Sequence, residues 1–183
     1  INGEGILDTA TIRTMVTDNC QSSGVLDITY DVVDFTCADI TLGGTTIEIT
    51  ITAIDTLANS NQCLFYIKVL DALPPVITGG MSSTVECDGA GNTAAFAAWL
   101  ASNAGASATD NCTDPVTWSN NSIGLSDDCA ETGTETVTFT ASDAYSNTST
   151  VSFTFTIEDT TPPTITAAAS DMTVECDGAG NTT

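Results

Sequence analysis

Cysteine, aspartate and glutamate are the side chains that could do chemistry in this 183-residue chain. It contains seven cysteines and 24 acidic residues, but two basic residues and no histidine. Cysteines can pair in disulfides, and carboxylate oxygens are the ligands that a hard cation such as Ca²⁺ takes. Histidine, the commonest general base, is missing. Two carboxylates such as Asp127 and Asp128, or Glu86 and Asp88, could form a glycosidase pair, but nothing beyond their proximity supports this. We therefore predict that the chain is not an enzyme.

The formal net charge of −22 at pH 7 excludes two classes of partner. Two cations cannot neutralise a phosphate backbone, so we expect no nucleic acid. Anionic membrane surfaces repel the chain for the same reason. No apolar run approaches the roughly 18 residues of a membrane-spanning helix, so we expect no direct membrane insertion.

An internal repeat organises the sequence. The ten residues TVECDGAGNT occur at 84–93 and again at 173–182, and residues 53–78 align without gaps with residues 141–166. Self-similarity of this kind indicates tandem structural units. We expect three parts: a unit at 1–75 that lacks its first strand, a complete unit at 76–163, and the first strand segment of the next unit at 164–183.

The frame of the repeat predicts a filament. The segment at 164–183 is what the unit at 1–75 lacks, so the tail of one copy matches the head of the next. Either the polypeptide continues covalently, or separate subunits exchange a strand. Both arrangements place other copies of the chain head to tail as its partners.

Alternating apolar and polar residues predict strands at 47–53, 63–69, 136–141 and 151–157. The Ala-rich stretch at 94–102 predicts one short helix, and the two Pro-Pro pairs stiffen the junctions between units. Short strands in units of about ninety residues are typical of Greek-key β-sandwiches. We therefore expect an all-β chain of tandem sandwiches.

Cysteine spacing predicts two disulfides. Asp-Asn-Cys occurs at Cys20 and at Cys112, and the next cysteine, Cys37 or Cys129, follows at the same distance in both units. The matched spacing favours the pairs Cys20–Cys37 and Cys112–Cys129. Disulfides indicate an oxidising compartment, so we expect an extracellular or cell-surface location.

Three further cysteines are assigned by the phase of strand alternation. Cys63 shares its phase with Phe65, and Cys176 shares its phase with Val174, so both point inward. We expect Cys176 of one copy to bridge Cys63 of the next. Cys87 would then face Val151 and stay a buried thiol. The alternative is that all three are unpaired small core residues.

The motifs TDNC at 109–112, TVTFTASDAYSN at 136–147 and IEDTTPPTIT at 157–166 resemble the hyalin-repeat branch of bacterial Ig-like domains. The resemblance covers essentially the whole chain. It implies Ig-like β-sandwiches with an adhesive or structural role in a large secreted or surface protein. The sequence departs from the family pattern at Val151, where many relatives carry a cysteine, as this chain does at Cys63.

An Ig-like sandwich would bring acidic loops together at a domain junction. Ca²⁺ takes six to eight oxygen ligands and tolerates irregular geometry, so we expect calcium there. The ligands would be Asp71, Asp110, Asn111, Asp143 and Asn147 in one unit, and Asp18, Asp55 and Asn59 with Asp159 of the preceding copy in the other. The alternative is that these residues only form turns.

Surface Asn and Thr residues suggest glycans. Asn-x-Ser/Thr acceptor patterns begin at Asn120, Asn147 and Asn181, and Thr9 and Thr56 lie in Asp-Thr-aliphatic patterns that resemble bacterial O-glycosylation sites. Asn111 begins a fourth pattern but is a poor acceptor beside a bonded Cys112. Such patterns also arise by chance in a Thr-rich chain.

These observations predict a structural repeat unit of an extracellular filament or surface stalk. The alternative is an adhesin, or a carbohydrate- or ligand-binding module of a cell-surface protein. A binding module would need a cluster of exposed aromatic side chains, and the two tryptophans lie in sequence contexts typical of a core.

Overall fold

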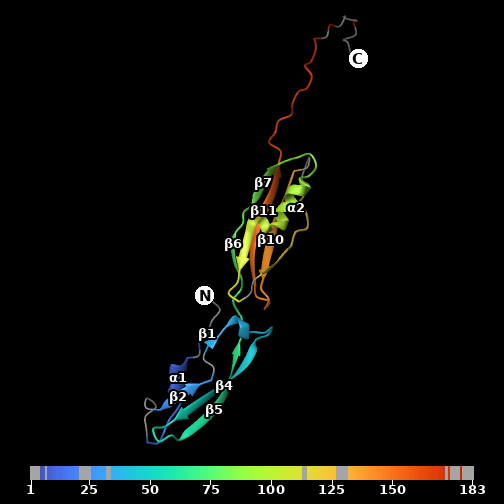
Figure 1. Ribbon diagram of the computed structural model, residues 1–183. Helices are drawn as coiled ribbons and strands as arrows, with labels where there is room; N and C mark the ends of the chain where they lie inside the picture. Colours follow the sequence, from blue (N-terminus) through green and yellow to red (C-terminus); the bar gives the residue numbers. More distant parts are fainter. Residues whose placement is uncertain are drawn as a thin grey trace.

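The computed structural model describes residues 5–6, 8–20, 26–31, 34–112, 115–126, 132–171, 173 and 178. Its strands form two units that follow one another along an elongated molecule (Figure 1). Strand β5 of the first unit ends at Val69 and strand β6 of the second begins at Val76, so residues 70–75 link the units. The prediction of an all-β chain with a short helix is confirmed.

The first unit is a three-stranded antiparallel sheet with small additions. The sheet has the order β2-β4-β5, and β1 pairs separately with β3. Its elements are β1 (Gly5–Ile6), α1 (Thr9–Arg13), β2 (Asp27–Tyr30), β3 (Asp34–Phe35), the 3-10 helix η1 (Cys37–Asp39), β4 (Thr45–Ile54) and β5 (Ser60–Val69).

The second unit has a larger sheet, in the order β7-β11-β10-β9, and a separate β6-β8 pair. β7 runs parallel to β11, and the other pairings are antiparallel. Its elements are β6 (Val76–Gly79), β7 (Ser83–Glu86), α2 (Thr93–Ala101), η2 (Asn103–Gly105), β8 (Ala106–Thr109), β9 (Thr117–Asn120), β10 (Gly133–Ser142) and β11 (Thr148–Glu158).

Alternation in the sequence sets the two faces of the second sheet. Val137, Phe139 and Ala141 of β10 are fully buried. The intervening threonines lie on the other face, where the Thr136 and Thr154 hydroxyl oxygens are 2.9 Å apart. Apolar residues at every second position thus bury one face of the strand, and hydroxyl pairs link the other. The four predicted strands lie within β4, β5, β10 and β11.

The hairpin turns repeat between the units. β4 and β5 are joined through Asp55–Asn59, and β10 and β11 through Asp143–Asn147. The non-glycine residues Ala58 and Ser146, which align in the repeat, both take left-handed backbone conformations, with φ of 66° and 74°. The repeat in sequence is therefore a repeat in backbone geometry.

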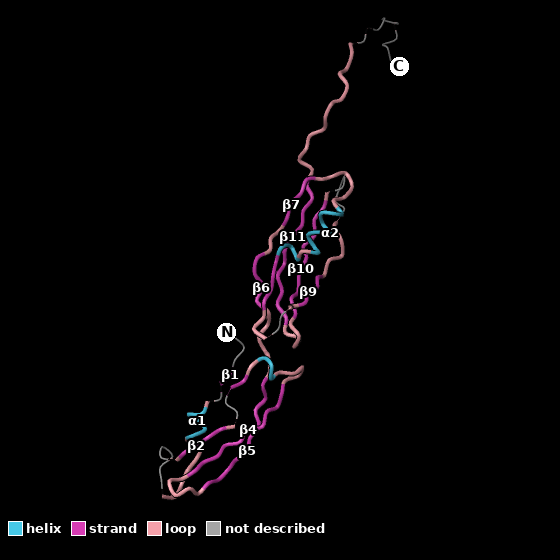
Figure 2. The backbone as a smooth tube through the Cα atoms, viewed as in Figure 1, coloured by secondary structure: helices cyan, strands magenta, loops and turns pink. Residues whose placement is uncertain are grey.

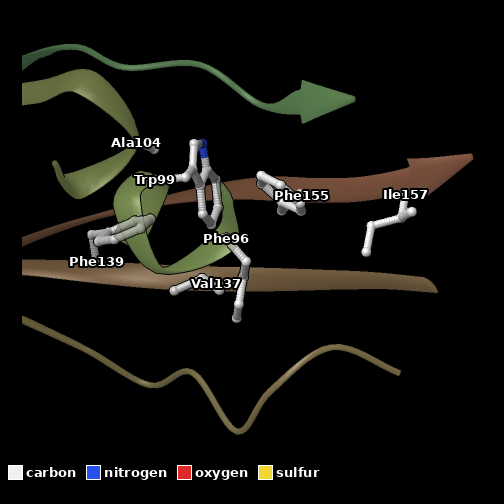
Figure 3. Close-up of a cluster of buried hydrophobic side chains, with 7 residues drawn as sticks. All are labelled: Phe96, Trp99, Ala104, Val137, Phe139, Phe155 and Ile157. Carbon is white, nitrogen blue, oxygen red and sulfur yellow. The ribbon is translucent and has the colours of Figure 1, made fainter. Parts of the chain in front are cut away.

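Helix α2 covers the buried face of the second sheet (Figure 3). Phe96 and Trp99 point from the helix toward Phe139 of β10 and Phe155 of β11. The Trp99 ring meets Phe139 at a centroid distance of 5.4 Å and an angle of 75°, an edge-to-face contact. The observed helix confirms the prediction at 94–102, with bounds shifted by one residue.

Residues 164–171 leave the second unit as an exposed, extended loop that forms neither helix nor strand (Figure 2). Ile165 within it is 88% exposed. In the described part of the chain, no helix has the length and apolar character needed to cross a membrane.

Truncating the aromatic core should unfold the second unit selectively. Phe139→Ala removes a fully buried ring that Trp99 contacts, so we expect a loss of about 3–5 kcal/mol in free energy of unfolding. Both tryptophans, Trp99 and Trp118, lie in this unit, so urea unfolding followed by tryptophan fluorescence measures it directly. Thr136→Ala on the opposite face should cost less than about 1 kcal/mol, and equal losses would contradict this core.

Candidate functional site

The edge of the second sheet is covered by a strand that has no equivalent in the part of the first unit that the structure describes. β7 pairs in parallel with the end of β11, Thr84 beside Thr156 and Val85 beside Ile157. β5, the counterpart of β11 in the internal repeat, has no strand along its outer edge among the described residues. An open edge leaves backbone N–H and C=O groups available for pairing with another strand.

An open groove of about 820 Å³ lies beside the uncovered sheet of the first unit. Helix α1 has no fully buried residue, so it does not seal the sheet as α2 does. Apolar side chains line the groove from α1, the residues after it, and the sheet: Ile12, Met15, Val16, Ile51 and Phe65. Asp18 and Asp55 also line it.

The same positions of the second unit are filled. Phe153, the counterpart of Phe65, packs against the aromatic core and lies against Gly80, where a Cβ atom would come within 2.5 Å of the ring. Ile77 of β6 pairs with Ala108 of β8. Residues 16–18 of the first unit correspond to residues 108–110 at the end of β8, and they form neither helix nor strand. The groove therefore lies where β6 and Gly80 pack in the second unit, whereas the position of β7 corresponds to residues 67–70 along the open edge of β5.

Glu86, at the end of β7, holds that strand in place. Its carboxylate accepts four hydrogen bonds from the backbone N–H groups and hydroxyls of Thr160 and Thr161. Bonds from the Thr160 and then the Thr161 hydroxyl are the main reason that the pKa of Glu86 falls from 4.5 to about 2. Sequence analysis did not identify this role of Glu86, because its hydrogen-bond partners lie more than seventy residues away.

The two units are joined by a disulfide that the spacing argument did not predict. Cys37 of η1 is bonded to Cys112 after β8, with a Cα–Cα distance of 5.1 Å. The predicted pairs Cys20–Cys37 and Cys112–Cys129 are therefore wrong. Cys20 is exposed and unbonded to another cysteine, and Cys129 lies outside the described residues. Because the cysteines recur at the same positions in every unit, their spacing cannot distinguish a bond within one unit from a bond between adjacent units.

The phase argument gives the right face but the wrong position for Cys87 and the wrong exposure for Cys63, and the bridge between Cys176 and Cys63 of adjacent copies stays a prediction. Cys87 lies beside Glu158, whose carbonyl accepts its backbone N–H at 2.8 Å, so it is seven residues along β11 from Val151. By the repeat, Cys176 would lie near Leu70 of a neighbouring unit rather than near Cys63. Alternation fixes which face a residue occupies, but not its position along the strand. Cys63 is exposed in this chain, and Cys176 lies outside the described residues.

Three predicted acidic ligands do come together at the junction. One carboxylate oxygen from each of Asp71, Asp110 and Asp143 lies within 4.8 Å of the other two. They come from three segments: the linker, the residue after β8, and the β10–β11 turn. Asp71 and Asp143 are 8% and 7% exposed, and Asp110 is half-buried. We call this group the junction triad.

Local turns fix each carboxylate of the junction triad through its Oδ1 atom. Asp71 accepts the N–H of Leu73 at 3.2 Å, and Asp110 accepts that of Cys112 at 2.9 Å. Asp143 accepts the N–H of Tyr145 at 2.9 Å. These turns hold the carboxylates without neutralising them.

Asn147 and Asn111 border the junction triad as predicted. The Asn147 amide donates to Asp143 Oδ2 at 2.7 Å and to the carbonyl of Asp71 at 3.2 Å, which ties the linker to the second unit. Asn111 donates to Cys112 Sγ at 3.2 Å. The Tyr145 hydroxyl donates to the Ile40 carbonyl of the first unit at 3.3 Å, a contact that sequence analysis missed.

The electrostatics of the junction triad single out Asp71. Burial raises the pKa of its carboxyl, and the nearby charges of Asp110 and Asp143 add to this increase. Its Oδ2 atom is buried and accepts no hydrogen bond of normal geometry within the described part of the chain. A buried carboxylate oxygen without a donor is unfavourable, and a bound cation would compensate for it.

The second predicted ligand set has the same turns, and its assembly stays a prediction because it requires Asp159 of a preceding copy. Asp18 accepts the N–H of Cys20 at 2.8 Å, Asp55 that of Leu57 at 2.8 Å, and Asp159 that of Thr161 at 3.1 Å. Asn59 repeats the contact of Asn147, because its amide donates to Asp55 Oδ2 at 2.7 Å. Among the described residues, the junction triad is the one acidic group close enough to hold an ion.

The predicted glycan acceptors differ in their surroundings. Asn120 and Thr56 are exposed, and Thr9 is half-buried. The Asn147 amide is a poor acceptor, since both of its hydrogen-bond donor positions are used at the junction. Asn181 lies outside the described residues.

No protein-family model matches the chain, and no curated protein matches it.

Neutralising Glu86 tests the contact that anchors β7. The lowered pKa means that the wild-type chain should be more stable than Glu86→Gln above about pH 4.5. This difference should shrink as the pH falls from about 4.5 to about 2, where Glu86 becomes protonated. Urea unfolding across this pH range, followed by tryptophan fluorescence, measures it. Glu158→Gln at the exposed end of β11 is the control, and equal stability of Glu86→Gln and wild type at pH 7 would contradict the assignment.

Proposed function

We propose that the chain is a structural repeat unit of an extracellular filament or surface stalk. Units join head to tail when the segment after Pro163 of one copy adds to the first unit of the next. One observation carries the proposal: the first unit has an open sheet edge and an apolar groove where the second has β6 and β7, and residues 164–182 repeat the sequence of those two strands.

The internal repeat assigns a register to this contact. On β11, Val85 lies beside Ile157, so its copy Val174 would lie beside Val69 of β5. On β8, Ala108 lies beside Ile77, so Ile165 would lie beside Val16. The connection between the two strands is one residue longer in the C-terminal segment and carries alanines, so the match concerns the strands and not their turn.

Strand addition would solve two problems of the isolated unit. It supplies main-chain hydrogen bonds to the open edge of β5, and it covers the apolar groove. It also buries Ile165, which is 88% exposed here, whereas its counterpart Ile77 is half-buried. The same contact forms whether the copies continue as one polypeptide or are separate subunits. The net charge of −22 keeps neighbouring filaments apart in either case.

Head-to-tail joining would reproduce the junction between the two units of one chain. Asp159 of one copy would approach Asp18 and Asp55 of the next, as Asp71 approaches Asp110 and Asp143 here. The same correspondence between the two kinds of junction applies to the cysteines. The counterpart of the Cys37–Cys112 bond joins Cys129 of one copy to Cys20 of the next. These disulfides support an extracellular location.

A synthetic peptide tests the strand contact. A fluorescently labelled peptide of residues 164–183, with Cys176 replaced by serine, should bind the chain saturably with a Kd on the order of micromolar. The matched control is the same peptide with Ile165→Asp and Val174→Asp, which should not bind because the first change places charge beside Val16 in the groove and the second places charge beside Val69 on the edge of β5. Fluorescence anisotropy gives both affinities, and absence of binding by the unmodified peptide would overturn the strand contact.

Cys20 tests the disulfide between copies. Concentrated chain under mild oxidation should form a ladder on a non-reducing denaturing gel, and reduction should collapse it. Cys20→Ser should abolish the ladder because it removes one partner of the proposed bond. Cys63→Ser is the control, since Cys63 is equally exposed but has no assigned partner. A ladder that persists in Cys20→Ser and disappears in Cys63→Ser would show that the pairing is different.

A further inference from the structure

We propose that the junction triad, Asp71, Asp110 and Asp143, binds a calcium ion between the two units. The three ligand oxygens lie within 4.8 Å of one another. Close carboxylates alone are common on acidic surfaces. The distinguishing observation is the buried Oδ2 atom of Asp71, which accepts no hydrogen bond of normal geometry among the described residues, although the Asn111 side chain lies close to this carboxylate and the residue is only 8% exposed.

The surroundings of the triad leave its negative charge uncompensated by side-chain cations. The chain has two basic residues, Arg13 and Lys68. The Arg13 guanidinium donates to the Leu26 carbonyl, and Lys68 lies on β5 beside Thr46. The increase in the pKa of Asp71 through burial and neighbouring carboxylates is the expected effect of such an arrangement without an ion.

The donor set favours calcium over other metals. All three ligands are hard carboxylate oxygens, whereas zinc prefers thiolate and imidazole ligands. Cys112 is close in sequence but is bonded to Cys37, and the chain has no histidine. Ca²⁺ accepts irregular sets of six to eight oxygens, so water can complete the shell from the side of the half-buried Asp110. Mg²⁺ demands near-ideal octahedral geometry and fits such a loose set less well.

Binding would fix the linker to the second unit. Asp71 belongs to the segment between β5 and β6, and the other two ligands belong to the second unit. The ion would therefore add a further connection at this junction, beside the Cys37–Cys112 bond, the Tyr145 contact with Ile40 and the Asn147 contact with the Asp71 carbonyl. This inference concerns contacts within one chain and does not depend on the head-to-tail assembly.

Thermal unfolding and calorimetry test the site. After treatment with EGTA, wild-type chain at constant ionic strength should gain about 3–8 °C in Tm when 1 mM CaCl₂ is added, as followed by tryptophan fluorescence. Isothermal titration with CaCl₂ should show a binding event, and 1 mM MgCl₂ should not produce the same event. An unchanged Tm together with no binding heat would overturn the proposal.

The Asp71→Asn variant distinguishes a ligand from a turn residue. It should be at least as stable as wild type in EGTA, because it removes a buried charge, but it should lose the increase in Tm with CaCl₂. Asp110→Asn provides a second variant should Asp71→Asn fold poorly.

Asp88→Asn is the matched control, because Asp88 makes the same turn as Asp143 but lies outside the triad and outside the second predicted ligand set. Its response to CaCl₂ should equal that of wild type. A full calcium response in both Asp71→Asn and Asp110→Asn would refute the assignment. Loss of the response in Asp88→Asn would likewise place the ion elsewhere.

Discussion

The structure depends on covering one apolar sheet face and one sheet edge in each unit. The second unit covers its face with α2 and its edge with β7, which Glu86 ties to the chain leaving β11. The first unit has the same central hairpin, but α1 is too short to cover the sheet and β5 stays open. The difference between the units is therefore a difference in what covers them, and not in how their central hairpins are built.

The pole where the units meet concentrates the other strong interactions. A disulfide, the Tyr145 contact with Ile40, the Asn147 contact with the linker and the junction triad all lie there. Each carboxylate of the triad is held by a short turn, so its position is set by local backbone geometry before the units pack. A junction built in this way fixes the linker through several independent contacts, although residues 70–75 contain no helix or strand.

Sequence patterns predicted the strands, the helix and the acidic residues of the junction, because alternation, alanine content and repeated Asp turns are local properties. They failed where the answer depends on the relation between units. Cys37 and Cys112 occupy positions that recur in both units, so the cysteine spacing could not show which unit supplies the partner of Cys37. The phase of Cys87 gave its face but not its place beside Glu158. Glu86 carried no recognisable signal, since Thr160 and Thr161 reach it only in the folded unit.

The disulfide also determines how the chain would carry tension. A pull on the two ends passes from Cys37 directly to Cys112, so the 75-residue separation between them is shielded from extension. At roughly 3.5 Å per residue, that loop holds about 260 Å of contour length in reserve. Strands β4 to β8, helix α2 and the linker lie inside it and cannot be pulled out to their full length while the bond is intact. The extensibility of residues 37–112 is therefore set by the redox state of one bond.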